Sequence, residues 1–271
     1  MRIVSFNVNS VRVREPLLLS YLQKVSPDIL ALQETKVVDQ DFPRQVYEDL
    51  GYHVSCFGQK SYNGVAIISK EKPLTLQNGF VTDTEESAKR LQIATFATSQ
   101  GSELVVFNGY FPQGENQEHP TKYPAKMKFY DDLLSTLEGY SATQDLVIMG
   151  DLNIAPTDAD VGIGPQNAKR WLKTGKCSFL PEERQRIEEL KNWGLLDSFR
   201  EKYPDVEDQF SWFDFRSRGF AANPRRGLRI DQIWVTPSLM EKCEDAGIDY
   251  ELRAQERPSD HCPIWADFNM A

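Results

Sequence analysis

Short apolar runs recur along the whole chain, and polar, glycine or proline residues bound each of them. Runs of this length that are rich in β-branched and aromatic residues are typical of buried β-strands. They predict strands at 2–6, 28–32, 64–69, 91–97, 103–109, 145–150, 229–235 and 262–268. Apolar residues spaced three and four apart instead predict helices at 15–25, 125–140 and 181–199.

The order of these elements predicts the class of the fold. The chain begins strand–helix–strand, continues with several strands in succession, and then returns to a mixture of helices and strands. A purely parallel sheet would require strict alternation of strands and helices. We therefore expect an α/β fold in which antiparallel pairing contributes to more than one sheet. Because no linker or low-complexity stretch divides the sequence, we expect residues 1–271 to form a single domain.

Polar side chains stand at the ends of the predicted strands. Five follow the carboxyl end of a strand: Asn7, Glu34, Tyr110, Asp151 and Asn153. Three others lie at or just before the start of a strand: Asp231, Asp260 and His261. All eight can meet along one edge only if the strands that carry the last three run in the opposite direction. The pattern therefore again predicts mixed sheets.

The chemistry of these eight residues becomes informative when they are taken together. Singly, an acid or amide after a strand is usually a turn residue. As a group they supply oxygen ligands of the kind that Mg²⁺ selects, together with one imidazole. Phosphodiester hydrolysis needs a cation, an attacking water and help for the leaving oxygen. Glu34 suits the role of anionic ligand, Asp151 with Asn153 could orient or deprotonate the water, and His261 held by Asp231 could bind the phosphate as a cation.

The net charge of −9 argues mildly against a nucleic-acid partner, but the positive charge is not spread evenly. It is clustered at 88–90, 169–176, 216–218 and 225–229, and the aromatic residues Trp171, Trp212, Phe213 and Phe215 lie within or near these clusters. Such clusters are usually solvated surface, yet they could also form a local basic face.

Other features of the sequence predict the location of the protein. No apolar run is long enough to span a bilayer, and the N-terminus does not resemble a secretory signal, so we expect a cytoplasmic protein without membrane contact. The four cysteines are widely scattered, which predicts free thiols.

Several motifs closely resemble the exonuclease III family, the bacterial DNA-repair branch of the exonuclease–endonuclease–phosphatase superfamily. They include "LQETK", "NGYFPQG", "GDLNIAPTD", "TGKCSFLPEER", "FSWFDFRS" and "PSDHCPIWADF", and the likeness extends from Met1 to about Phe268. The resemblance implies a four-layer α/β sandwich with two mixed sheets inside and helices outside. It also implies Mg²⁺- or Mn²⁺-dependent hydrolysis of double-stranded DNA. Separately, nothing in the sequence pattern calls for more than one copy of the chain, so we expect a monomer. The implied activities are 3′-to-5′ exonuclease, cleavage 5′ to abasic sites, and removal of 3′ phosphates.

The same resemblance implies roles for individual residues. The implied metal site comprises Asn7, Glu34, Asp151, Asn153, Asp260 and His261. The implied catalytic groups are Tyr110, Asp151, Asn153, Asp231 and His261. Substrate contacts are implied for Arg90, Lys122 and the aromatic side chain of Trp212, and "RWLKTGK" at 170–176 is expected to form a loop near the DNA groove. Whether Asp151, Tyr110 or a metal-held water starts the reaction stays open.

Two other functions remain to be weighed against a nuclease. One is a phosphatase or phosphodiesterase of the same superfamily that acts on phosphoinositides or sphingolipids. The motif "SWFDFRS" would have no role in such an enzyme. The other is a DNA-binding module that keeps the fold without catalysis. Such a module would be expected to lack some of the eight strand-end residues, which are all present.

Overall fold

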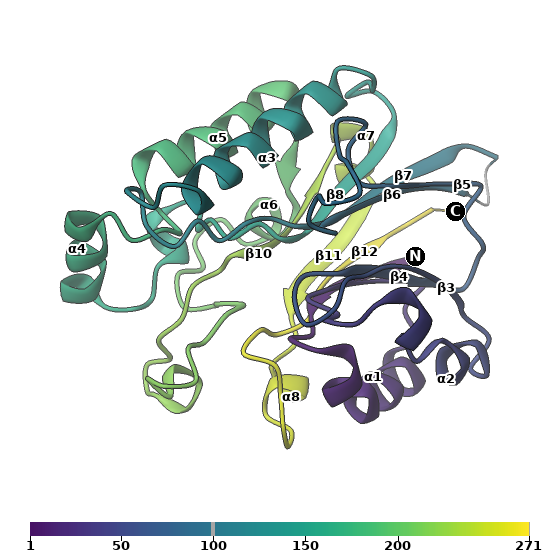
Figure 1. Cartoon of the computed structure of the whole chain (residues 1–271), viewed down its shortest axis with the longest axis horizontal. Helices are drawn as coiled ribbons and strands as arrows, with labels where there is room; N and C mark the ends of the chain where they lie inside the picture. Colours follow the sequence, from purple (N-terminus) through teal and green to yellow (C-terminus); the bar gives the residue numbers. More distant parts are fainter. Residues whose placement is uncertain (99–100, 271) are drawn as a thin grey trace.

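The computed structural model describes residues 1–98 and 101–270, and two six-stranded sheets form its centre (Figure 1). The first sheet has the order β11 (Cys243–Ile248), β12 (Ile264–Phe268), β1 (Arg2–Asn7), β2 (Ile29–Gln33), β4 (Val65–Ser69), β3 (His53–Phe57). The second has the order β5 (Thr75–Asn78), β6 (Leu91–Ala97), β7 (Glu103–Tyr110), β8 (Asp145–Asp151), β10 (Asp231–Val235), β9 (Leu196–Asp197).

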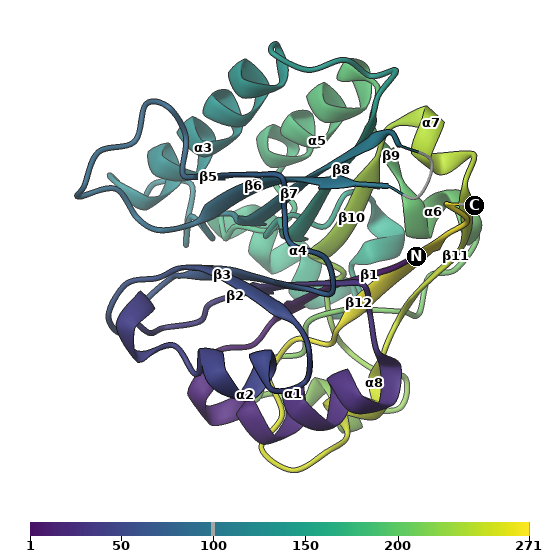
Figure 2. The same ribbon diagram turned by 90° about the vertical axis from the view of Figure 1, so that its right-hand side faces the viewer.

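Helices cover the outer faces of both sheets. Figure 2 shows the sheets nearly edge-on, with α3 (Lys122–Leu137) and α5 (Pro181–Trp193) on one outer face and α1 (Val11–Val25) and α2 (Arg44–Glu48) on the other. The remaining helices are α4 (Pro165–Thr174), α6 (Ser198–Lys202), α7 (Pro237–Met240) and α8 (Tyr250–Arg253). The four-layer sandwich with two mixed sheets is confirmed.

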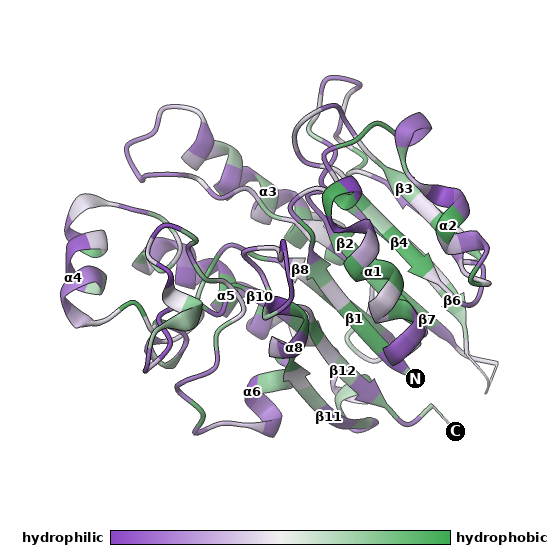
Figure 3. Cartoon of the chain, turned by 90° about the horizontal axis from the view of Figure 1, so that it is seen from below, coloured by the Kyte–Doolittle hydropathy of each residue, from purple (hydrophilic) through white to green (hydrophobic). Residues whose placement is uncertain are grey.

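Apolar side chains fill the space between the sheets and the space beneath the helices. Between the sheets, Ile3 and Ile67 of the first pack in one cluster with Val106 and Val147 of the second. Because the central strands are buried on both faces, most of their residues are apolar, as Figure 3 shows for β1, β2 and β4. This is why they could be recognised in the sequence.

All eight predicted strands are present, and the required reversals of direction are confirmed. Strand β1 is parallel to β2 and antiparallel to β12, while β8 is parallel to β7 and antiparallel to β10. The strands that the pattern missed are β3, β5, β9 and β11, which are the edge strands of the two sheets. Edge strands carry exposed polar residues and need no continuous apolar run.

Two predictions about helices were wrong in part. The helix expected over 181–199 ends at Trp193, because Gly194 has a φ of +123° and stops it before β9 and α6 begin. The segment 170–176, expected to be a loop, lies mostly in α4. Pro165 is the first residue of that helix, and Gly175, whose backbone is left-handed, follows its last residue. These two signals define the helix, although none of its residues is buried.

Two smaller predictions concern the cysteines and the membrane. All four cysteines, which lie within the described ranges, carry free thiols as predicted. In the part of the chain that the structure describes, no helix combines the length and apolarity needed to cross a membrane.

Candidate active site

The register of the strands brings the predicted residues to one edge of the molecule. In the first sheet, Asn7 at the end of β1 lies beside Gln33, the residue before Glu34. In the second sheet, the pairing places Tyr110 opposite Asp151, and Asp151 opposite Asp231. The segment that contains Asp260 and His261 immediately precedes β12, the antiparallel neighbour of β1.

Residues of the two sheets touch directly at this edge. The Nδ2 atom of Asn7 donates to Glu34 Oε1 at 2.9 Å and to Asp151 Oδ2 at 2.9 Å. Potential ligand atoms of Glu34, Asp151 and His261 all lie within 4.8 Å of one another. The predicted convergence of distant strand ends is therefore confirmed.

Two residues of the site have backbone conformations that non-glycine residues seldom adopt. The φ angles of Glu34 and Asn153 are +53° and +55°. Such strain persists only where surrounding bonds hold it, and it concentrates at functional sites. Here the carbonyl of Glu34 accepts from Ser10 N at 2.8 Å, and the Nδ2 atom of Asn153 donates to the Phe111 carbonyl at 2.9 Å.

His261 is buried and is held in one orientation by Asp231. Its Nδ1 atom lies 2.8 Å from Asp231 Oδ2, and its Nε2 atom lies 3.8 Å from Asp151 Oδ2. Burial opposes the charged imidazolium, but the carboxylates of Asp231 and Asp151 outweigh it and raise the pKa of His261 to about 10. The ring is thus a cationic donor at neutral pH, with Nε2 facing the centre of the site.

Asp151 and Tyr110 both have raised pKa values. Burial raises the pKa of Asp151 to about 8, the Asp231 and Glu34 carboxylates add to this, and His261 opposes it. Burial, together with Glu34 and Asp151, raises the pKa of Tyr110 well above its usual value. Tyr110 is therefore a neutral phenol that can donate a hydrogen bond.

The site concentrates negative charge in a way that fits a divalent cation. Burial disfavours ionised Glu34, but Lys36, whose Nζ lies 2.7 Å from Glu34 Oε2, lowers the pKa of this carboxyl. Around Asp151, the carboxylates of Asp231 and Glu34 act in the same direction as burial and favour its protonated form. Because the donors are hard oxygen atoms, they fit Mg²⁺ or Mn²⁺.

Asp260 lies beside this cluster and is held by two other side chains. Its Oδ1 atom accepts from Asn9 Nδ2 at 2.9 Å, and its Oδ2 atom accepts from Trp212 Nε1 at 3.1 Å. Asn9 in turn accepts from Lys36 Nζ at 2.6 Å. Asp260 thus joins the acidic centre to the aromatic wall of the site.

Two neighbouring cavities open at the site. The first, of about 250 Å³, is lined by Glu34, Tyr110, Gln113, Asp151, Asn153, Trp171, Lys176, Ser178, Trp212, Leu228, Ile230, Asp260 and His261. The second, of about 340 Å³, shares Trp171, Lys176 and Trp212 with the first and adds the cations Arg170, Arg216 and Arg226. Three of the basic clusters in the sequence therefore meet beside the acidic centre.

The remaining predicted residues take different places. Trp212 lines both cavities, and the contact with substrate that the resemblance implies for it stays a prediction. The guanidinium of Arg90 lies over the Tyr110 ring at 4.5 Å and donates to the Tyr110 carbonyl at 3.0 Å, so it supports the site from behind. Lys122 is exposed at the start of α3 and forms an ion pair with Glu115. Phosphate contacts by Arg90 and Lys122 stay predictions.

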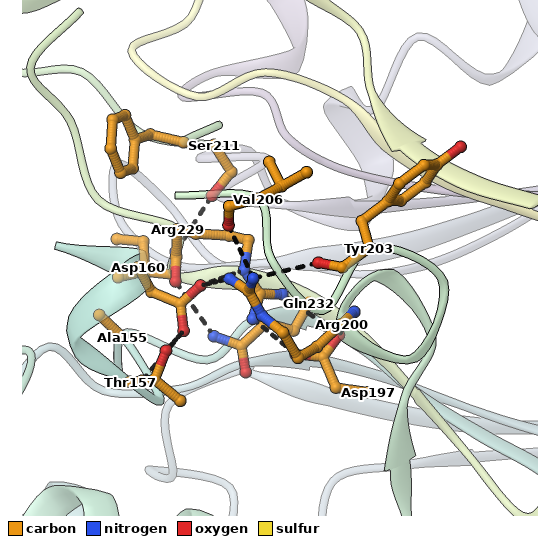
Figure 4. A network of polar contacts seen from close by, with 12 residues as sticks. Ala155, Thr157, Asp160, Asp197, Arg200, Tyr203, Val206, Ser211, Arg229 and Gln232 are labelled. Atoms are coloured by element: carbon orange, nitrogen blue, oxygen red, sulfur yellow. Dashed lines mark hydrogen bonds and ion pairs between the residues drawn. The ribbon is translucent and has the colours of Figure 1, made fainter. Parts of the chain in front are cut away.

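Arg229, which the sequence placed in a basic cluster, is instead the buried centre of an ion network (Figure 4). It donates to Asp160 Oδ1 and Asp197 Oδ2, each at 2.6 Å, while Arg200 donates to Asp160 at 2.7 Å. Since Leu228 and Ile230 line the first cavity, the alternation of a strand sends Arg229 to the other side. The network fixes the segment that leads to Asp231.

Sequence reasoning also missed several supporting residues. Lys36, Asn9 and Lys126 contact the acidic or amide residues of the site. Lys36 follows Glu34 by two residues and could have been noted for that reason. Lys126 had no comparable signal, because a lysine on a helix is normally exposed.

Comparisons with known proteins agree with this geometry. Residues 4–261 match the model of the endonuclease/exonuclease/phosphatase family. The chain is 52% identical over 269 residues to exodeoxyribonuclease III of Haemophilus influenzae, and the alignment covers 99% of this chain and all of the relative. It is 31% identical over 272 residues to an exodeoxyribonuclease of Bacillus subtilis, over the full length of both.

Solved structures show the same likeness. A 3′ phosphatase from Neisseria bound to a product DNA hairpin superposes with a TM-score of 0.90 at 36% identity, over 99% of each chain. An AP endonuclease from Archaeoglobus fulgidus superposes with a TM-score of 0.88 at 33% identity, again over 99% of each chain. With its strand ends converging on an acidic centre, the chain belongs to the endonuclease/exonuclease/phosphatase family.

Proposed function

We propose that this protein is a DNA-repair nuclease that hydrolyses phosphodiester bonds of double-stranded DNA with the help of a divalent cation. Its reactions are removal of nucleotides from 3′ ends, cleavage 5′ to abasic sites, and removal of 3′ phosphates. The observation that carries the proposal is the placement of Glu34, Asp151 and His261, with ligand atoms within 4.8 Å, in a cavity walled by Trp212. Relatives named exodeoxyribonuclease III, 3′ phosphatase and AP endonuclease support it.

The residues that would hold Mg²⁺ or Mn²⁺ are Glu34 and Asp151, with Asn7, Asn153 and Asp260 beside them. When bound, the cation supplies positive charge that offsets the phosphate and its reacting oxygens. His261 was included in the expected ligand set, but its charged ring, with Nδ1 held by Asp231, is better suited to donate to the phosphate.

The other groups of the cavity have complementary roles. Asp151 lies in the cavity between the side chain of His261 and the backbone N–H of Asn153, where its carboxylate is placed to accept a proton from an attacking water. Tyr110 keeps its proton and can donate a hydrogen bond to the charge that develops on the phosphate. Between these two, Asp151 is therefore the better candidate for the base.

The surroundings of the cavity support the proposal of an abasic DNA substrate. The Trp212 ring with Leu228 and Ile230 offers an apolar surface to a sugar that lacks its base. Lys176 and Arg216 in the adjoining cavity provide cations for the phosphate backbone, which resolves the conflict between a net charge of −9 and a DNA partner.

A short duplex that contains one abasic analogue tests the proposal. We expect cleavage 5′ to the analogue with Mg²⁺, none with EDTA, and none with Asp151→Asn in either buffer. An intact duplex with Mg²⁺, combined with phosphate release from a phosphoinositide or sphingolipid, would instead favour the lipid branch of the superfamily. A monomeric state and a cytoplasmic location stay predictions.

A further inference from the structure

Lys126 on α3 is a buried cation that the proposed chemistry does not use. Its side chain has 0% exposure and lies behind the wall of the cavity. A lysine in such a place normally costs stability, because its ammonium must leave water. An apolar side chain of similar length would fill the same space without this cost. What the ammonium adds is three directional hydrogen bonds.

The partners of Lys126 come from three separate segments. Its Nζ atom donates to the Asn153 carbonyl at 2.9 Å, to the Gln113 carbonyl at 3.3 Å, and to Glu183 in a buried ion pair. The second oxygen of Glu183 accepts from the backbone N–H groups of Ser178 and Leu180, both at 2.8 Å. One buried pair therefore joins the segments that follow β7 and β8 to the start of α5.

Each of these segments forms part of the first cavity, since Gln113, Asn153 and Ser178 all line it. The connection through Asn153 reaches the reacting groups. This residue has a left-handed backbone, and its N–H donates to Asp151 Oδ1 at 3.1 Å. The carbonyl that Lys126 holds and the N–H that donates to Asp151 belong to the two peptide groups that meet at the Cα atom of Asn153, so a displacement of this backbone disturbs both hydrogen bonds.

We propose that Lys126 is a positioning residue, which fixes the backbone of Asn153 and thereby the orientation of Asp151. The kinetic consequences of this inference rest on the proposed function, whereas the claim that Lys126 fixes the backbone of Asn153 does not. A displacement of about 1 Å among reacting groups can lower a rate by about 10²-fold. Loss of the ammonium should therefore lower kcat by about this factor and leave KM within about threefold.

Three variants separate positioning from simple stabilisation. Lys126→Met removes the bonds to both carbonyls and leaves Glu183 without its cation. Lys126→Met/Glu183→Gln removes the unpaired charge while keeping an oxygen for Ser178 and Leu180. Lys242→Met is the matched control, because it breaks an ion pair with the buried Asp145 at the opposite end of β8.

The measurements are kcat and KM on the abasic duplex, the thermal midpoint, and amide hydrogen exchange of residues 151–154 without metal or DNA. We expect the double variant to recover the thermal midpoint but not kcat, and Lys242→Met to lose stability with normal kcat. Exchange at 151–154 should be faster in both Lys126 variants than in the wild type.

Recovery of kcat together with stability in the double variant would overturn the inference. Unchanged hydrogen exchange at 151–154 would do the same. A wild-type protein that leaves the abasic duplex intact would instead refute the proposed function. The exchange measurement would then decide the structural claim by itself.

Discussion

Replacing Asp231 by asparagine removes the carboxylate that lies 2.8 Å from His261 Nδ1 and keeps a side chain of the same shape. In the wild type, burial opposes the charged ring, yet Asp231 and Asp151 bring the pKa of His261 to about 10. Without Asp231, burial is opposed mainly by Asp151 and Asp260, so the pKa should fall to about 6.5 or lower, the value of an ordinary histidine.

The expected loss of activity depends on pH. A raised pKa means that the charge is present below that pKa and disappears as the pH rises through it. The wild-type ring therefore stays charged up to about pH 9, whereas in the variant only about a tenth of the molecules carry the charge at pH 7.5. The deficit in kcat/KM attributable to the lost charge should be about twofold at pH 6.5, about tenfold at pH 7.5 and about 100-fold at pH 8.5.

The assay is cleavage of the abasic duplex at saturating Mg²⁺ between pH 6 and 9. The wild type, Asp231→Asn and a control variant are measured in the same buffers. Asp267→Asn is the control, since it makes the same chemical change in an ion pair with Arg2 at the other end of β12. A ratio of variant to wild type that stays constant across this range would refute the reasoning. It would show that Asp231 acts by orienting the ring and not by maintaining its charge.

Four further changes test other parts of the account. Asp151→Asn should abolish turnover but leave duplex binding, measured by fluorescence anisotropy, within about threefold; lost binding would assign it a structural role. Glu34→Ala should raise the Mg²⁺ concentration needed for half-maximal cleavage by at least about tenfold, and an unchanged titration would exclude it as a ligand. Trp212→Ala should reduce abasic cleavage more than degradation from a plain 3′ end, whereas equal losses would indicate packing. Arg229→Met should lower the free energy of unfolding in urea by about 3–5 kcal/mol, because Asp160 and Asp197 lose their buried partner; a loss below about 1 kcal/mol would contradict this.

The central strands could be predicted because they are buried on both faces and therefore consist of continuous apolar runs. The edge strands β3, β5, β9 and β11 were not predicted, because burial constrains the residue types on only part of their surface. Helix α4 escaped for a related reason, since none of its residues is buried and its ends alone define it.

The polar residues at strand ends were predictable as a group, although their mutual contacts were not. The sequence indicated that Asp151 and Asp231 could meet if their strands were antiparallel. It did not indicate that Asn7 would join Glu34 to Asp151, because that contact depends on how the two sheets pack. Lys126 and Arg229 were unpredictable because the burial of a charged residue depends on partners that are distant in the sequence.

The most direct test of the central claim is a crystal soaked in Mn²⁺ and measured for anomalous scattering. The account predicts a peak within coordinating distance of Glu34 and Asp151, with His261 retaining its contact to Asp231. A fully occupied Mn²⁺ elsewhere with no peak at Glu34, or an ion bound by the His261 ring, would contradict it.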